Sequence, residues 1–220
     1  LPISITMFVA AALGSRLSSR YSIRAIVRTG LASVSLGVLL LLSAVEPTLN
    51  GPAFAASMAV LGTGMGLMAS QLGTVVQSSV DSSGRSEAGG LQFTGQQLGS
   101  SLGLALIGAI VLTSLTSVFL STVEQDERLS AEVTEQVGVA VGGGVDFVSS
   151  DQIGDAAQDT GLDESSSAAL VEDYDLAQLQ SLRLGLLAAA LLVLVGVPST
   201  AHLPHSLQSR AEGSREVSPE

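Results

Sequence analysis

Long stretches without a charged residue alternate with short polar or turn-forming segments along most of the sequence. The uncharged runs cover residues 29–45, 52–80, 88–123 and 184–209. About 20 helical residues cross a bilayer core roughly 30 Å thick, whereas helices on the surface of soluble proteins carry charges on their wet face. The pattern therefore predicts helices that span a membrane.

These runs predict an all-α fold, a polytopic bundle of transmembrane helices. Complete spans are expected at about 26–45, 52–78, 88–120 and 180–202. In terms of domains, residues 1–120 would hold transmembrane helices one to four, 121–178 an exterior loop, 179–203 the last transmembrane helix and 204–220 a cytoplasmic tail. The first helix is expected to be partial, because the apolar run 1–15 is short for a span and begins without Met. We therefore expect the chain to be a fragment.

Composition supports a membrane protein. Hydrophobic residues make up 46% of the chain and aromatic residues only 3%, and the mean hydropathy is positive, as in polytopic membrane proteins. The chain has no cysteine, which excludes disulfides and thiolate metal sites.

The distribution of arginine predicts the orientation of the helices. Four arginines lie between Ser15 and Arg28, and the positive-inside rule assigns such a segment to the cytoplasm. Alternation then makes residues 79–87 and 203–220 cytoplasmic and residues 46–51 and 121–178 exterior. Seven of the nine arginines fall on the cytoplasmic side without further adjustment.

Acidic residues are concentrated in the predicted exterior loop. Residues 124–178 contain fourteen acids and one arginine, few aromatic residues and the run Gly142–Gly144. This composition predicts a mostly disordered loop, although 124–140 and 165–180 have helical character, the latter with a cap from Ser165 to Ser167. Asp151, Asp155, Asp159 and Asp163 would share one face of a helix, but the loop lacks the Asp-x-Asp-x-Asp-Gly pattern of a calcium site. We therefore expect no metal site.

Two of the predicted spans carry stripes of small residues. In the fourth helix Gly95, Gly99 and Gly103 recur every four residues, a spacing that lets another helix approach closely. Gln92 and Gln96 lie on the same face, where they either hydrogen-bond between helices or line a substrate path. Gln97 points away and is expected to make a packing contact.

The third helix repeats this arrangement. Gly62, Gly66 and Gly73 lie on one side as expected packing positions, and Ser70 and Gln77 lie at its edge as further candidates for a substrate path. The spans contain no acid, lysine or histidine at depth and no catalytic set. We therefore expect no enzyme, no cofactor and no nucleic-acid partner.

Leu17, Arg20 and Arg24 form a pattern that resembles the cytoplasmic gating loop G-x-L-x-D-R-x-G-x-R of the major facilitator superfamily. Ser15, Ser19 and Ser22 stand in place of the Gly, Asp and Gly of that loop. The run from Gly90 to Gly103 is similar to S-G-L-x-N-T-x-R-Q-L-G-x-x-x-G of the fourteen-helix drug:proton antiporters. It agrees at Gly90, Leu91, Thr94, Gln97, Leu98, Gly99 and Gly103 and differs at Phe93 and Gln96.

The resemblance implies the last five helices of a transporter in a cell membrane, with the bacterial inner membrane expected. Such proteins export hydrophobic or cationic compounds by alternating access between two six-helix bundles. The implied partners are the lipid bilayer, a small-molecule substrate, protons and the missing N-terminal half, which would hold the proton-coupling carboxylates. The alternative is a non-transporting membrane subunit that uses its exterior acidic loop for assembly.

Overall fold

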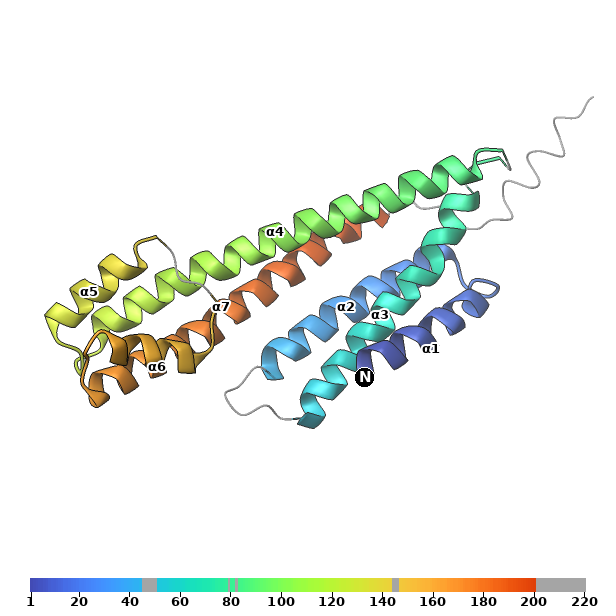
Figure 1. The fold of residues 1–220 in the computed structure, drawn as a ribbon. Coiled ribbons are helices and arrows are strands. Elements are labelled where there is room, and N and C mark those ends of the chain that lie inside the picture. Colours follow the sequence, from blue (N-terminus) through green and yellow to red (C-terminus); the bar gives the residue numbers. More distant parts are fainter. Residues whose placement is uncertain (45–50, 79, 82, 144–146, 201–220) are drawn as a thin grey trace, which may run out of the picture. The chain divides into compact units, whose positions relative to one another are not determined.

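The computed structural model describes residues 1–44, 51–78, 80, 81, 83–143 and 147–200. Within these ranges the chain is all-helical, with seven helices and no strand (Figure 1). The helices are α1 (Pro2–Leu17), α2 (Ile23–Ala44), α3 (Gly51–Ser78), α4 (Arg85–Gln125), α5 (Ala131–Val141), α6 (Ser150–Asp159) and α7 (Glu164–Ser199). The predicted all-α fold class is confirmed.

Four of these helices, α2, α3, α4 and α7, are long and apolar enough to cross a membrane. The helix α1 is apolar but has only 16 residues. Large apolar side chains remain exposed along the long helices, including Leu39, Leu102, Leu191 and Val195. Exposed apolar surface of this extent suits contact with lipid. The chain is therefore placed among multi-pass membrane proteins.

The predicted spans and the observed helices agree most closely for α2 and α3. The helix α4 has 41 residues and α7 has 36, so at 1.5 Å per residue they are about 60 Å and 54 Å long, well beyond a bilayer core of about 30 Å. The part of α7 up to Arg183 carries acids, and only residues 184–199 are free of charge. We therefore treat only the uncharged part of α7 as membrane-spanning. The predicted turn 46–51 and the predicted tail 204–220 lie almost wholly outside the described residues.

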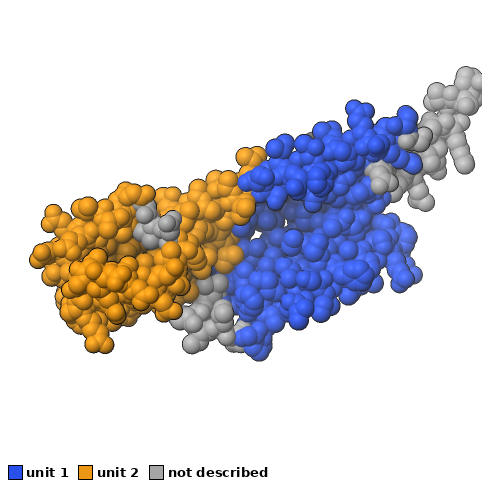
Figure 2. Space-filling view, in the orientation of Figure 1, with its two compact units in different colours: residues 1–44, 48–101, 189–220 blue, residues 45–47, 102–188 orange. Residues whose placement is uncertain are grey.

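The chain divides into two compact units, coloured separately in Figure 2. Unit 1 comprises residues 1–44, 48–101 and 189–220, and unit 2 comprises residues 45–47 and 102–188. Among the described residues, unit 1 contains α1, α2, α3, the start of α4 and the end of α7. Unit 2 contains the rest of α4 and α7 together with α5 and α6.

Glycines let α3 pack closely against α2 in unit 1. A Cβ atom added to Gly64 would lie 2.6 Å from the carbonyl oxygen of Gly30 and 2.7 Å from the backbone nitrogen of Val34. A Cβ atom added to Gly37 of α2 would lie 2.8 Å from the backbone nitrogen of Leu61. These helix backbones can approach so closely only because no side chain lies between them.

A second glycine face of α3 packs against α1. A Cβ atom added to Gly62 would collide with the carbonyl oxygen of Ile3, and one added to Gly66 would collide with the carbonyl oxygen of Met7. Both glycines therefore occupy helix contacts. In contrast, a Cβ atom added to Gly73 would meet no described atom within 4 Å.

Unit 2 has a hydrophobic core that the sequence analysis did not foresee. Leu115 and Phe119 of α4 pack with Leu170 and Tyr174 of α7, and the rings of Phe119 and Tyr174 meet edge to face with centroids 5.5 Å apart. Apolar side chains of α5 and α6 cover this core, which also includes Val123, Leu129, Ala157, Ala169 and Ala177.

The prediction that residues 121–178 are mostly disordered is therefore wrong for the described part of that segment. Its few apolar residues recur at helical spacing and bury themselves against the ends of α4 and α7. Leu115 and Phe119 of α4 precede this segment, so its composition does not count the apolar surface that they add to the core.

Polar side chains begin the helices of unit 2. The hydroxyl of Ser130 accepts a hydrogen bond from the backbone nitrogen of Val133 at 3.3 Å at the start of α5. At the start of α6, the backbone nitrogen of Ser149 donates to Oε1 of Gln152 at 3.2 Å. For α7 the expected cap from Ser165 to Ser167 is wrong, because the carboxylate of Asp163 accepts from the hydroxyl of Ser165 and the backbone nitrogen of Ser166. Those serines lie inside the first turns of the helix.

Candidate functional site

A groove of about 520 Å³ lies in unit 1 between the end of α3 and the start of α4. Its walls are almost entirely apolar, formed by Leu72, Val75, Val76, Val80, Ala88 and Leu91. Gln92 and Gln96 line the groove one helical turn apart, with Gly95 beside them. An apolar hollow with a few fixed polar groups is the usual form of a small-molecule site.

The two amides give this groove its polar chemistry. Each glutamine side chain offers two N–H donors and one carbonyl acceptor. Gln92 is half-buried and Gln96 is exposed, so both groups are open to a ligand. The described lining contains no ionisable side chain. The groove can therefore hold an apolar molecule and orient it by hydrogen bonds.

The other candidates for a substrate path lie elsewhere or outside the description. Ser70 is directed toward α1, where a Cβ atom added to Gly14 would collide with its hydroxyl. Its hydroxyl donates to the carbonyl oxygen of Leu67 at 2.7 Å. Gln77 belongs to α3, but its side chain is not among the described parts of the structure.

Gln71 is a buried amide that the sequence analysis missed. Only 1% of its surface is exposed, and its Nε2 donates to the carbonyl oxygen of Gly14 and to the hydroxyl of Ser70, both at 3.0 Å. This amide links α3 to the end of α1. An amide inside a charge-free run needs such partners, and that requirement was the available signal.

The glycine stripe of α4 contacts nothing in the described chain. Added Cβ atoms at Gly95, Gly99 and Gly103 would meet no described atom within 4 Å. Leu98 is 60% exposed, and Gln97 is exposed as well. The packing role of this stripe and of Gln97 stays a prediction.

The residues of the predicted gating loop surround the connection between α1 and α2. Leu17 ends α1, and its carbonyl oxygen accepts hydrogen bonds from the backbone nitrogens of Arg20 and Tyr21, both at 2.9 Å. Arg20 is exposed in this turn, and Arg24 lies half-buried in the first turn of α2. One turn further on, Nε of Arg28 donates to the hydroxyl of Thr200 at 3.1 Å.

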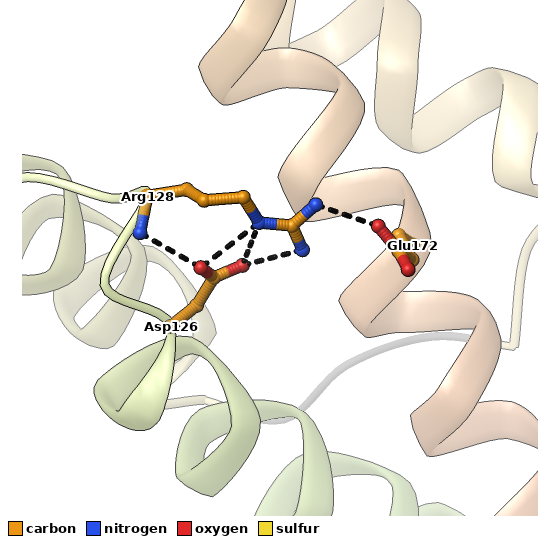
Figure 3. Close-up of polar contacts among 3 residues, drawn as sticks. All are labelled: Asp126, Arg128 and Glu172. Atoms are coloured by element: carbon orange, nitrogen blue, oxygen red, sulfur yellow. Dashed lines mark hydrogen bonds and ion pairs between the residues drawn. The ribbon is translucent and has the colours of Figure 1, made fainter.

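In unit 2 a cluster of charged residues joins the end of α4 to α7 (Figure 3). The guanidinium of Arg128 binds Asp126 and Glu172, each at 2.7 Å. Hydrogen bonds from Arg128 lower the pKa of Asp126, and the two carboxylates raise the pKa of Arg128. Since Arg128 and Glu172 are exposed, the pairs fix the direction of these side chains more than they stabilise the fold.

Asp173 lies beside this cluster, in the acidic part of α7 that precedes the uncharged run. Its exposed fraction is 2%, and its Oδ2 accepts no hydrogen bond from any described group. Burial, followed by repulsion from Asp126, raises the pKa of Asp173 to about 6. Sequence reasoning missed this residue because it treated every acid of the segment as solvated.

No group of three or more His, Cys, Asp or Glu side chains suited to a metal ion occurs among the described residues. Compared with known protein families, curated proteins and solved structures, the chain shows no match.

Proposed function

We propose that this chain forms part of a secondary active transporter that exports small hydrophobic or cationic compounds in exchange for protons. The groove between α3 and α4 would be part of its substrate path. The membrane would be a cell membrane, with the bacterial inner membrane as the expected location. This proposal rests on the combination of long apolar helices with one groove that is apolar and carries two amides.

The chemistry of the groove supports a substrate that is largely apolar. Leu72, Val76 and Leu91 offer surface to an apolar body, and Gln92 and Gln96 offer hydrogen bonds to a polar group at its edge. The described residues of the groove would supply no proton-accepting side chain. In this proposal the coupling carboxylates belong to the N-terminal bundle that the family resemblance implies.

The orientation proposed from the arginines fits such a transporter. The turn with Arg20 and Arg24 would face the cytoplasm, and the acidic segment 121–178 would face the exterior. The long α4 and α7 would then extend beyond the bilayer on the exterior side, because the acids of α7 all precede its uncharged run.

The test is an efflux assay on the full-length transporter with Gln92→Leu, Gln96→Leu and the matched control Gln97→Leu. Leucine keeps the side chain's size but removes the amide. We expect either groove variant to change the efflux rate or the preference among drugs several-fold, and the control to behave as wild type. Wild-type transport by both groove variants at equal membrane abundance would overturn the assignment of the groove.

One observation favours the alternative of a membrane subunit that assembles through its acidic segment. That segment contains a folded core and three exposed acids on α6, Asp151, Asp155 and Asp159. Replacing all three by asparagine separates the two functions. Efflux should persist if the protein is a transporter, whereas the alternative predicts loss of a co-purifying partner and no efflux activity in the wild type.

A further inference from the structure

A second hollow, of about 390 Å³, lies in unit 2 beside the charged cluster. It is formed by the last turns of α4 and the facing side of α7, and most of its lining is polar. The polar lining residues are Ser121, Thr122, Gln125, Asp126, Arg128, Asp173 and Gln180. Neither the transport proposal nor the packing of unit 2 explains this concentration of polar groups.

Asp173 is one of the lining residues, and its buried Oδ2 lacks a hydrogen-bond partner in the described chain. Buried polar atoms in proteins are almost always hydrogen-bonded, because an unpaired one loses its interactions with water without replacement. The oxygen therefore requires a donor from outside the described chain.

Two hydroxyls restrict what that donor can be. Ser121 and Thr122 both donate to the carbonyl oxygen of Val118 at 2.9 Å. In this arrangement both hydroxyl protons are used, and the lone pairs of the two oxygens can accept hydrogen bonds from a molecule in the hollow. Together with Asp173 they present three acceptors.

The charge of the surrounding residues also favours a ligand that donates hydrogen bonds. Asp126, Glu172 and Asp173 face one cation, Arg128, which is already bound to the first two. With three carboxylates and one cation the cluster keeps a net negative charge, and Asp173 is not one of the two carboxylates that Arg128 binds. A ligand that is both cationic and rich in hydrogen-bond donors would satisfy all of these groups.

We propose that this hollow binds the ammonium group of a small primary amine. An ammonium group has three N–H donors and no acceptor, which matches the carboxylate of Asp173 and the hydroxyls of Ser121 and Thr122. A divalent metal fits less well, because calcium takes six to eight oxygen ligands and the described residues contain no metal-binding group of acids.

Protons should compete with the amine. Burial and the neighbouring Asp126 raise the pKa of Asp173 to about 6, while Arg128 acts in the opposite direction. Among the described residues, the further charged group that acts on it is Glu172. At pH 7.5 Asp173 is therefore ionised and able to bind, and at pH 5 it is mostly protonated and loses its attraction for the ammonium group.

The experiment measures binding of n-butylammonium to the purified chain in detergent by isothermal titration calorimetry. Salt at 0.15 M shortens the Debye length to about 8 Å and so suppresses diffuse attraction to the acidic surface. We expect saturable binding of one equivalent at pH 7.5, at least tenfold weaker binding at pH 5, and at least tenfold weaker binding of tetramethylammonium, which has no N–H donor.

Variants assign the binding to this hollow. Asp173→Asn should weaken binding at least tenfold, and Asp155→Asn, which removes an exposed acid from α6, should leave it unchanged. Thr122→Val removes one acceptor with little change in shape and should weaken binding several-fold. This variant still tests the proposal if Asp173→Asn does not fold. The proposal is overturned if no saturable binding occurs, if tetramethylammonium binds equally well, or if the folded variants at Asp173 and Thr122 bind as the wild type does.

Discussion

Replacing Gly64 by alanine tests whether α2 and α3 touch through their backbones. The new methyl group would lie 2.6 Å from the carbonyl oxygen of Gly30 and 2.7 Å from both the backbone nitrogen and Cγ2 of Val34. Two of these three atoms belong to the backbone, so they cannot move aside by a change of rotamer. The helices must separate by several tenths of an ångström along their contact.

The size of the effect follows from two opposing contributions. Alanine favours a helix over glycine by about 1 kcal/mol. Overpacking a close contact costs typically about 1–3 kcal/mol, and the loss of neighbouring contacts at Gly37 adds to it because the same two helices meet there. The net expectation for Gly64→Ala is a loss of about 1–2 kcal/mol.

The matched control is Gly73→Ala, on the same helix. Its methyl group would meet no described atom within 4 Å, so only the helix preference acts and stability should stay equal or rise by up to about 1 kcal/mol. Thermal unfolding in mild detergent, followed by far-UV circular dichroism, measures both variants. For a chain of this size 1 kcal/mol corresponds to about 2–4 °C. Equal melting temperatures for the two variants would refute the close contact.

Three further predictions concern the glycine stripe of α4, the orientation of the chain and the buried acid. Gly99→Leu should leave the melting temperature of this chain unchanged, since the position is open, yet lower efflux by the proposed transporter, because we expect another helix to occupy the stripe; normal efflux would mean that the stripe faces lipid. A cysteine replacing Asp155 should react with an impermeant thiol reagent added outside intact cells, and one replacing Ser18 should be protected; the reverse pattern would contradict the orientation. Stability should rise as the pH falls from 7 to 4, because the pKa of Asp173 in the folded chain, about 6, lies above its ordinary value of 3.8 and protonation relieves the buried charge. The gain is at most about 3 kcal/mol for a shift of about two pH units, and chemical unfolding of Asp173→Asn should lack this part of the pH dependence.

The pH prediction has an opposing contribution with its own range. Hydrogen bonds from the side chains of Ser165 and Ser166 lower the pKa of Asp163 to about 2. A carboxyl group whose folded pKa is lowered stabilises the fold above its unfolded pKa, and that contribution is lost as the pH falls from about 4 to 2. The two effects therefore separate, with the gain from Asp173 at pH 7 to 4 and the loss from Asp163 below.

The sequence by itself determined the helices. Runs such as 29–45 and 52–80 contain no charge and are long enough to span a bilayer, so helix is the form that satisfies every backbone hydrogen bond there. Helical spacing also placed Gln92 and Gln96 on one face of α4, and in the structure both side chains line the groove. The four-residue spacing of glycines likewise predicted packing at Gly62 and Gly66, where α1 approaches α3.

Only the tertiary structure decided which surfaces meet. Gly64 and Gly73 look alike in the sequence, yet one lies against the α2 backbone and the other lies open. Likewise, Asp155 and Asp173 are both acids of the same polar segment, but Asp173 is buried between helix ends that are far apart in sequence. Composition and helical spacing describe one helix at a time, whereas burial and the pKa of a carboxyl group depend on what another helix brings to it.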